Sequence, residues 1–260
     1  MINIDNKIDD LKEISLTSTS KGMLYKCIGR MNGKKVFIKT GNKLKNKFSN
    51  LEPISEVMAS DIISKFNIEC AKNELQWLRL PISDKEILTN ASYDFLEENE
   101  KLISIRAILN NYRGENLYEY IIELLPSYRV DIDRMIVMDF LINNIDRHLR
   151  NFSVIEEEGN IIKFAPLYDH GLSLYSDIQD FELEQDDIEI WESIDECKPF
   201  ADSHYKQLEL IGKVNLQSVN LEELLKIVDK YADYITEYRV KCIKYLITTR
   251  YNYLIERGIL

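Results

Sequence analysis

The sequence predicts an α+β fold with two lobes, a small β-rich lobe over residues 1–97 and a larger, mostly α-helical lobe over 98–260. Two observations lead to this prediction. The first third of the chain consists mainly of short runs rich in β-branched and aromatic residues, which favour strands. From about residue 103 onward, the apolar residues follow helical spacing instead. A chain of 260 residues is long enough to bury a core in this arrangement.

The first lobe begins with a predicted β-hairpin. Residues 23–29 and 34–39 are β-rich, and the Asn-Gly pair at 32–33 between them is a strong turn signal. A helix is expected over 53–66, where apolar residues recur at helical spacing. Further short strands are expected at 73–80, 85–89 and 92–97.

The second lobe is expected to form around a buried helix. The stretch from Met135 to Ile142 is apolar on nearly every face except at Asp139, which is typical of a central helix. A polar segment, Asn143 to Asn151, follows this helix and precedes a strand. The expected elements are helices over 115–125 and 131–143, a strand pair at 152–155 and 161–167, and two helices within 221–257.

Composition and charge argue against several classes of protein. The chain carries 33 Lys and Arg against 44 Asp and Glu, a formal net charge of −11, which disfavours direct binding to nucleic acid. No apolar run reaches the roughly 18 residues of a membrane-spanning helix, and the first residues show no secretory signal. The cysteines lie far apart without a CxxC pair, which points to a reducing cytoplasm rather than a disulfide framework or a zinc site.

Two short polar segments carry the residues that suggest chemistry. Asp146 and Asn151 lie in the polar segment after the buried helix, and Asp169 follows the second strand of the next hairpin. Polar groups beside such apolar elements are tolerated mainly where they have partners or a role. Two carboxylates and an amide at the ends of rigid elements can converge on Mg²⁺, which prefers oxygen ligands and completes its shell with water and substrate phosphates.

The pattern of these residues resembles the catalytic centre of the protein-kinase-like fold. Asp146 with Asn151 five positions later, then a hairpin, then Asp169 followed by Gly171, is similar to the family's catalytic loop and metal-binding Asp. The variant Asp-Arg-His-Leu-Arg-Asn at 146–151 looks like the phosphatidylinositol-kinase and HipA branch, and it most resembles HipA-like bacterial serine/threonine kinases. The resemblance implies transfer of the γ-phosphate of ATP, with Mg²⁺, to a Ser or Thr hydroxyl of a protein substrate.

The resemblance also implies roles for individual residues. Asp146 would accept the proton of the attacking hydroxyl, and Asn151 and Asp169 would bind Mg²⁺. Lys39, at the end of the second predicted strand, would bind the α- and β-phosphates of ATP as part of the catalytic centre. Glu56, early in the following helix, would pair with Lys39 and keep it directed at the phosphates.

Two further segments are implied to bind ATP. The polar stretch 17–22 stands where the family has the loop over the phosphates, and in HipA-like kinases a Ser in this loop can be autophosphorylated and switch the enzyme off. Residues 93–97 would form the connector between the lobes, where adenine is read. The ATP-binding residues implied in these segments are Ser18, Thr19, Ser20, Lys21, Gly22, Phe95 and Glu97.

The sequence departs from the family in several places. Asn144-Ile145 replaces the His-Arg pair that precedes the catalytic Asp in eukaryotic kinases, and the phosphate loop has one Gly instead of several. The chain lacks room for the extra N-terminal subdomain of full-length HipA proteins, so such a part would be a separate polypeptide or dispensable. Within the resemblance, the implied biology is a bacterial toxin or stress regulator, with an antitoxin as a candidate partner.

Other functions remain open at the level of sequence. The acceptor could be a small molecule or an inositol lipid, the reaction could be nucleotidyl transfer, or the chain could be a non-catalytic kinase-like module that binds nucleotide or a partner protein. A metal hydrolase would use Asp146, His148, Asp169 and His170 as ligands, although the sequence has no HExxH pattern. The acidic segment 177–196 is either a solvated face or a docking surface for a basic protein.

Overall fold

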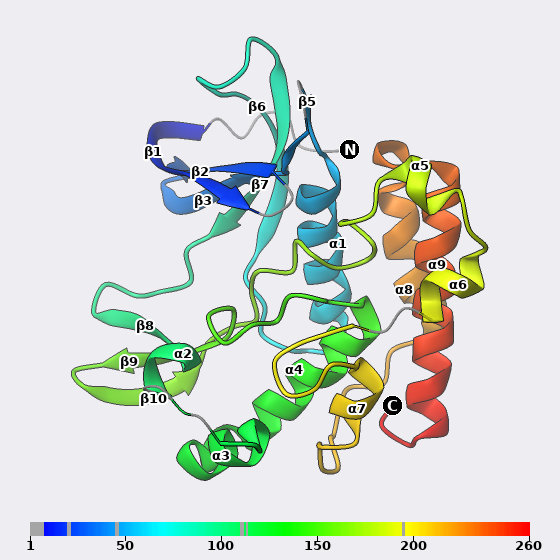
Figure 1. The fold of residues 1–260 in the computed structure, drawn as a ribbon. Helices are drawn as coiled ribbons and strands as arrows, with labels where there is room; N and C mark the ends of the chain where they lie inside the picture. Colours follow the sequence, from blue (N-terminus) through cyan, green and yellow to red (C-terminus); the bar gives the residue numbers. More distant parts are fainter. Residues whose placement is uncertain (1–7, 20–21, 45–46, 110–111, 113, 194–195) are drawn as a thin grey trace.

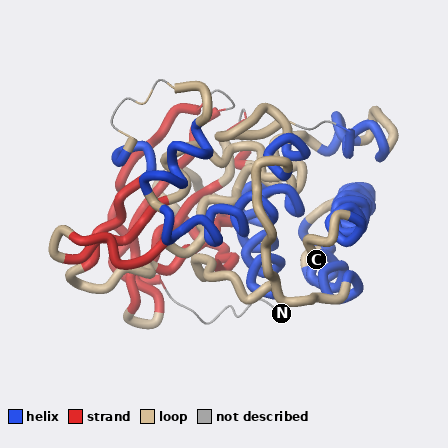
Figure 2. Tube along the Cα trace, turned by 90° about the horizontal axis from the view of Figure 1, so that it is seen from below, coloured by secondary structure: helices blue, strands red, loops and turns tan. Residues whose placement is uncertain are grey.

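The molecule has a part rich in strands and a part rich in helices, as Figure 1 shows from the side and Figure 2 from below. A computed structural model of the chain describes residues 8–19, 22–44, 47–109, 112, 114–193 and 196–260. Helix α1 (Leu51–Lys65) lies between the two parts. This arrangement confirms the α+β class predicted from the sequence. No helix among the described residues has the length and apolar character needed to cross a membrane.

The first part of the chain forms an antiparallel sheet. Within the described residues, 7 strands join in the order β5-β4-β2-β3-β7-β6, with β1 paired to β2 outside this path. The turn between β2 and β3 has positive φ angles at Asn32 (53°) and Gly33 (75°), as the Asn-Gly signal predicts. The strands are β1 (Ile8–Thr19), β2 (Gly22–Met31), β3 (Lys34–Thr40), β4 (Lys43–Leu44), β5 (Lys47–Phe48), β6 (Asn73–Arg79) and β7 (Glu86–Tyr93).

The sheet differs from the sequence prediction in two places. Strand β1 is not predicted, yet it pairs with β2 from Ile8 to Thr19. The two strands predicted at 85–89 and 92–97 form the single strand β7, and residues beyond Tyr93 lie outside it. The buried Asn90 side chain in the middle of β7 donates to Asn73 Oδ1 at 2.7 Å. A polar residue is therefore tolerated inside this strand because its neighbour supplies a hydrogen-bond partner.

The second part of the chain is built around α4 (Arg129–Ile142), whose apolar side chains from Met135 to Ile142 are buried as predicted. Helix α4 packs against α7 and α9 and ends at Asn143, which has a left-handed φ of 52°. The other helices are α2 (Ile105–Ile108), α3 (Leu117–Leu124), α5 (Asp180–Leu183), α6 (Ile188–Ser193), α7 (His204–Leu208), α8 (Leu221–Lys230) and α9 (Glu237–Glu256), with the short 3₁₀ helices η1 (Pro126–Tyr128) and η2 (Ala232–Tyr234).

A small antiparallel sheet lies beside these helices, with its strands in the order β10-β9-β8. It consists of β8 (Glu100–Ser104), β9 (Ser153–Glu157) and β10 (Asn160–Phe164). The sequence predicts β9 and β10 as a pair but does not predict β8. Because β9 and β10 are antiparallel, the polar segment that enters β9 and the segment that follows β10 lie close together.

Two hydrophobic clusters stabilise the fold. The larger cluster joins α1 to α3, α4, α8 and α9, and the smaller one lies within the sheet, among residues of β2, β3 and β7. Helix α1 therefore packs with the helical part, although strands precede and follow it in the sequence. This packing fixes the polar residues of α1 relative to those that follow α4.

Candidate active site

A cleft lies between the sheet and the helical part of the molecule. One cavity in it has a volume of about 340 Å³. Its walls include five residues that the sequence analysis assigns to catalysis or binding, namely Lys39, Glu56, Asp146, Asn151 and Asp169. A second cavity of about 270 Å³ shares three of these residues and has more apolar walls, which include Phe37, Ile38, Phe95 and Leu102. The two cavities therefore adjoin each other and give the cleft a polar and an apolar end.

Lys39 and Asp169 form an ion pair at the centre of this cleft. Lys39 is the second-last residue of β3, and its Nζ lies 2.6 Å from Asp169 Oδ1. Burial lowers the pKa of Lys39, but the carboxylates of Asp169 and Glu56 outweigh this effect and hold it above its ordinary value. Burial likewise raises the pKa of Asp169, but Lys39 holds it well below its ordinary value. Both groups are therefore charged at neutral pH.

Glu56 lies in the cleft but does not form the expected ion pair, because Lys39 pairs with Asp169 instead. Its side chain, on α1, is buried, and the backbone N–H of His170 donates a hydrogen bond to it. Gly171 allows this close approach, since a Cβ at that position would lie 3.3 Å from Glu56 Oε2. Burial raises the pKa of Glu56, and Lys39 opposes the rise through charge. Glu56 thus lies near Lys39 in the cleft without an ion pair to it.

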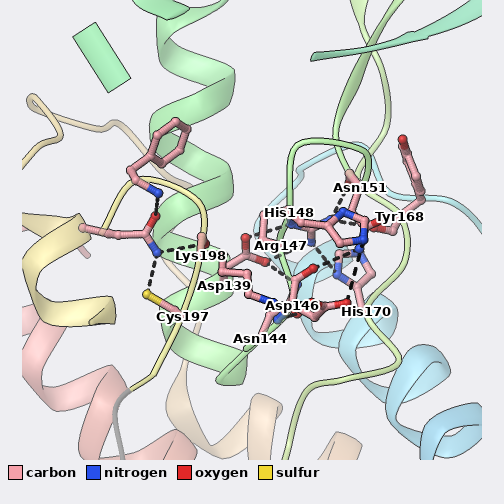
Figure 3. Close-up of polar contacts among 12 residues, drawn as sticks. Asp139, Asn144, Asp146, Arg147, His148, Asn151, Tyr168, His170, Cys197 and Lys198 are labelled. Atoms are coloured by element: carbon pink, nitrogen blue, oxygen red, sulfur yellow. Dashed lines mark hydrogen bonds and ion pairs between the residues drawn. The ribbon is translucent and has the colours of Figure 1, made fainter. Parts of the chain in front are cut away.

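Arg147 holds the polar segment after α4 in place (Figure 3). Its guanidinium is fully buried and donates from Nε and Nη2 to the two carboxylate oxygens of Asp139, at 2.8 and 2.9 Å. Nη1 donates to the backbone carbonyls of Asn151 (2.7 Å) and Tyr168 (2.6 Å). One side chain therefore joins α4, the segment before β9 and the segment after β10. The sequence analysis misses this role, although a lone Asp139 in an apolar helix is a signal of a buried partner.

His170 completes the Arg147 network from the other side. Its Nδ1 lies 2.9 Å from Arg147 Nη2, which can only donate, so Nδ1 accepts and the ring is neutral with its proton on Nε2. Nε2 lies 3.5 Å from Cys70 Sγ. Burial and the charge of Arg147 lower the pKa of His170 well below its ordinary value. Both ring nitrogens have partners, which argues against His170 as a ligand in a metal hydrolase.

Asp146 and Asn151 are joined by a hydrogen bond within the polar segment. Asn151 Nδ2 donates to the backbone carbonyl of Asp146 at 2.9 Å, which leaves the amide oxygen as its ligand atom. The Asp146 carboxylate is partly exposed, with Lys198 Nζ 3.0 Å from Oδ1 and His148 Nε2 4.0 Å from Oδ2. Asp146 thus faces the cavity with one carboxylate oxygen beside a cation.

A metal ion would have few protein ligands here. No group of three or more His, Cys, Asp or Glu side chains within the described parts of the chain is arranged to hold one. Asn151 and Asp169 both line the larger cavity and both offer oxygen atoms. This small oxygen donor set fits Mg²⁺, which commonly takes one or two protein ligands and fills its shell with water and substrate phosphates.

Of the residues expected to bind ATP in the two flanking segments, the structure describes Ser18, Thr19, Gly22, Phe95 and Glu97. Ser18 and Thr19 end β1, Gly22 begins β2, and Thr19 pairs with Gly22 across the two strands. Ser20 and Lys21 lie outside the described residues. In the connector, Phe95 lines the apolar cavity, whereas Glu97 is exposed and is not part of its wall.

Lys26 is a cleft residue that the sequence analysis misses. It pairs with Lys39 across β2 and β3 and lines both cavities. Burial, followed by the charge of Lys39, lowers the pKa of Lys26. The hairpin signal could have predicted this position, because a two-residue turn at 32–33 fixes the strand register and places Lys26 opposite Lys39.

Comparison with known proteins identifies the fold and the family of the chain. The chain is similar to the crystal structure of CtkA, a Helicobacter pylori proinflammatory kinase, with a TM-score of 0.74 and 16% sequence identity over 100% of this chain and 97% of that one. A Neurospora crassa PAN3 pseudokinase structure matches with a TM-score of 0.37 and 14% identity, over 98% of this chain and 66% of that one. No curated protein matches significantly. The fold is therefore kinase-like, and because the model of the HipA-like C-terminal domain matches residues 18–235, the chain belongs to that family.

Proposed function

We propose that this protein is a kinase that uses ATP and Mg²⁺ to phosphorylate a Ser or Thr hydroxyl of a protein substrate. The observation that carries the proposal is the convergence of Lys39, Asp146, Asn151 and Asp169 on one cavity, although they come from separate segments of the chain. The family and the kinase-like fold support it. In this proposal residues 1–97 and 98–260 act as the two lobes on either side of the nucleotide.

The two ends of the cleft suit the two ends of ATP. The apolar cavity beside Phe95 would take the adenine, and the ammonium groups of Lys39 and Lys26 would bind the phosphates. Asn151 and Asp169 would hold Mg²⁺, which neutralises charge on the β- and γ-phosphates. Binding of nucleotide requires the Lys39–Asp169 ion pair to open, because each partner is needed by a different part of the ligand.

Asp146 would act on the acceptor. Its partly exposed carboxylate can accept the proton of a Ser or Thr hydroxyl as the hydroxyl oxygen forms a bond to the γ-phosphorus. The bond between the γ-phosphorus and the bridging oxygen breaks, and its electron pair leaves with ADP. The buried Arg147 network would keep Asp146 in position through the fixed backbone of the segment.

The intact mass of the protein after incubation with ATP and Mg²⁺ tests this function. We expect the wild-type protein to gain the mass of one or more phosphates, with phosphopeptides that map to Ser or Thr. Asp146→Ala should not gain this mass yet should still bind ATP, whereas Asp202→Ala, which changes an exposed carboxylate, should behave like wild type. An adenylate-sized gain would indicate nucleotidyl transfer, and tight ATP binding without any transfer would indicate a non-catalytic module.

The family suggests a biological setting for the reaction. We propose a bacterial toxin or stress regulator of the cytoplasm, with an antitoxin or other separate polypeptide as partner and with Ser18 or Ser20 as the site of an inhibitory autophosphorylation. The phosphopeptide map of the same experiment tests the last point directly. Phosphate in a different segment would remove residues 17–22 from this role. Phosphorylation of small molecules or inositol lipids, tested with the same protein, is the alternative if no protein acceptor is found.

A further inference from the structure

A lysine from a distant part of the chain reaches the proposed catalytic carboxylate. Lys198 lies between α6 and α7, and its Nζ is 3.0 Å from Asp146 Oδ1 (Figure 3). The side chain of Lys198 is 58% exposed, so the pair faces the solvent side of the cleft. Such an exposed ion pair contributes little to stability. A contribution to folding stability therefore does not explain why Lys198 lies beside Asp146.

The backbone beside Lys198 is held by a buried amide. Gln207, on α7, is almost fully buried, and its Nε2 donates to the backbone carbonyl of Lys198 at 3.1 Å. Its Oε1 accepts from the backbone N–H of Phe200 at 3.1 Å. The Phe200 ring in turn packs edge-on against Tyr118 and Phe152, with centroid distances of 5.5 and 6.1 Å. Lys198 is thus an exposed side chain on a backbone that Gln207 holds at the Lys198 carbonyl and at the Phe200 N–H.

The polar segment itself leaves Asp146 without a permanent cation. The nearest guanidinium in sequence, Arg147, is buried and fully used by Asp139, two carbonyls and His170. Arg150 is exposed, and among the described residues the positively ionisable side chains within 4.0 Å of the Asp146 carboxylate are Lys198 and His148. A single permanent positive charge therefore stands at the position where the acceptor hydroxyl has to meet the γ-phosphate.

The net charge of the cleft makes this cation useful. Asp146, Asp169 and Glu56 line the larger cavity together with Lys39 and Lys26, so carboxylates outnumber ammonium groups before a nucleotide enters. Glu52 adds a fourth carboxylate, one oxygen of which is buried without a hydrogen-bond partner. A transferring phosphoryl group brings further negative charge. A positive charge that reaches this group during transfer lowers the energy of the transition state.

We propose that Lys198 is a further catalytic residue, whose ammonium leaves Asp146 to bind an oxygen of the transferring γ-phosphoryl group. This inference rests on the proposed kinase function. Lys198 stays protonated throughout, while the hydroxyl oxygen bonds to phosphorus, the bridging oxygen leaves with ADP and the hydroxyl proton passes to Asp146. Because Lys198 stays paired with Asp146 until the γ-phosphoryl group is transferred, its loss should lower the rate of transfer and leave the affinity for ATP unchanged.

The test compares Lys198→Met with wild type and with Lys206→Met. Lys206 lies nearby on α7, but it pairs with Asp202 at the surface. The rate of phosphate incorporation into the protein and the dissociation constant for ATP with Mg²⁺ are measured for each. We expect Lys198→Met to reduce the rate about 100-fold, as for loss of one preorganised donor. Its ATP affinity and thermal stability should match wild type. Lys198→Arg should recover part of the rate, and Lys206→Met should have no effect.

The outcomes separate this inference from the proposed function. An active wild-type protein with an equally active Lys198→Met variant would overturn the role of Lys198 and leave the kinase function standing. A faster Lys198→Met variant would show that the lysine blocks Asp146, which also overturns the inference. Loss of ATP affinity in step with loss of rate would make Lys198 a nucleotide-binding residue instead. A wild-type protein that transfers no phosphate to any acceptor would overturn both proposals.

Discussion

At the scale of single residues, the ion pair between Lys39 and Asp169 determines how the cleft receives a ligand. The two side chains satisfy each other at 2.6 Å, so a phosphate competes with Asp169 for Lys39, and a metal ion competes with Lys39 for Asp169. Under the proposed function, the nucleotide and the metal should therefore strengthen each other's binding. If a nucleotide binds without the metal, the Asp169 carboxylate competes with the phosphates for Lys39 and repels them.

This competition gives Asp169→Asn an effect that depends on the metal. With Mg²⁺, the variant should bind ATP more weakly than wild type by about tenfold or more, because a charged ligand of the metal is lost. Without Mg²⁺, it should bind ATP at least as tightly, because Lys39 is released from its partner. Titration calorimetry with and without the metal measures both values. Equal losses of affinity under the two conditions would contradict the assignment of Asp169 to the metal, and Asp202→Asn serves as the surface control.

The residues of the site were predictable where a local pattern carries them. Lys39, Asp146, Asn151 and Asp169 occupy recognisable positions relative to strands and a hairpin, and the structure places all four around one cavity. Lys198 was not predictable, because its approach to Asp146 depends on the path of a connection between α6 and α7. No periodicity or spacing in the sequence predicts the path of this connection.

At the scale of elements, Arg147 connects three parts of the helical region. It is buried with Asp139 on α4 and also satisfies carbonyl groups on both sides of the β9–β10 hairpin. Removing one partner of a buried ion pair leaves the other charge without compensation. Loss of Arg147 should therefore destabilise the segment that carries Asp146 and Asn151.

We expect Arg147→Leu to lower the free energy of unfolding by about 3–5 kcal/mol. Arg150→Leu, a matched change of an exposed arginine in the same segment, should alter it by less than about 0.5 kcal/mol. The double variant Asp139→Leu/Arg147→Leu should be more stable than Arg147→Leu alone, because no unpaired carboxylate remains. Urea unfolding followed by circular dichroism measures all three. Similar stabilities of Arg147→Leu and Arg150→Leu would show that the network does not stabilise the fold.

The elements themselves were predictable where a long apolar stretch or a clear turn signal marks them. Helices α1 and α4 and the hairpin of β2 and β3 agree with the sequence prediction to within a few residues. Strand β8 was missed because its pairing with β9 joins residues about fifty positions apart, as from Ser104 to Ser153. Long-range pairing of this kind depends on the tertiary fold rather than on local preference.

At the scale of the whole molecule, the larger core unites α1 with the helices of the second part, and two histidines are buried in the same region. His170 lies behind the cleft, and His204 begins α7. Burial lowers the pKa of both well below the ordinary 6.5, with the charge of Arg147 acting on His170 and that of Arg250 on His204. The folded protein therefore keeps both rings neutral under conditions in which the unfolded chain protonates them.

This difference predicts that stability falls as the solution becomes mildly acidic. For a base with a lowered pKa in the folded state, the stabilising contribution is complete above the unfolded value of 6.5 and is lost as the pH falls below it. Two such groups should reduce the free energy of unfolding by up to about 2.7 kcal/mol per pH unit. Glu56, whose pKa is raised, acts in the opposite direction and limits the loss at the acidic end.

Urea unfolding at several pH values between about 7.5 and 5 measures the slope. His204→Gln should reduce the slope by about half, since one of the two titrating rings is removed. An unchanged slope in that variant, or a flat profile in the wild-type protein, would show that the buried rings do not determine the acid sensitivity of the fold.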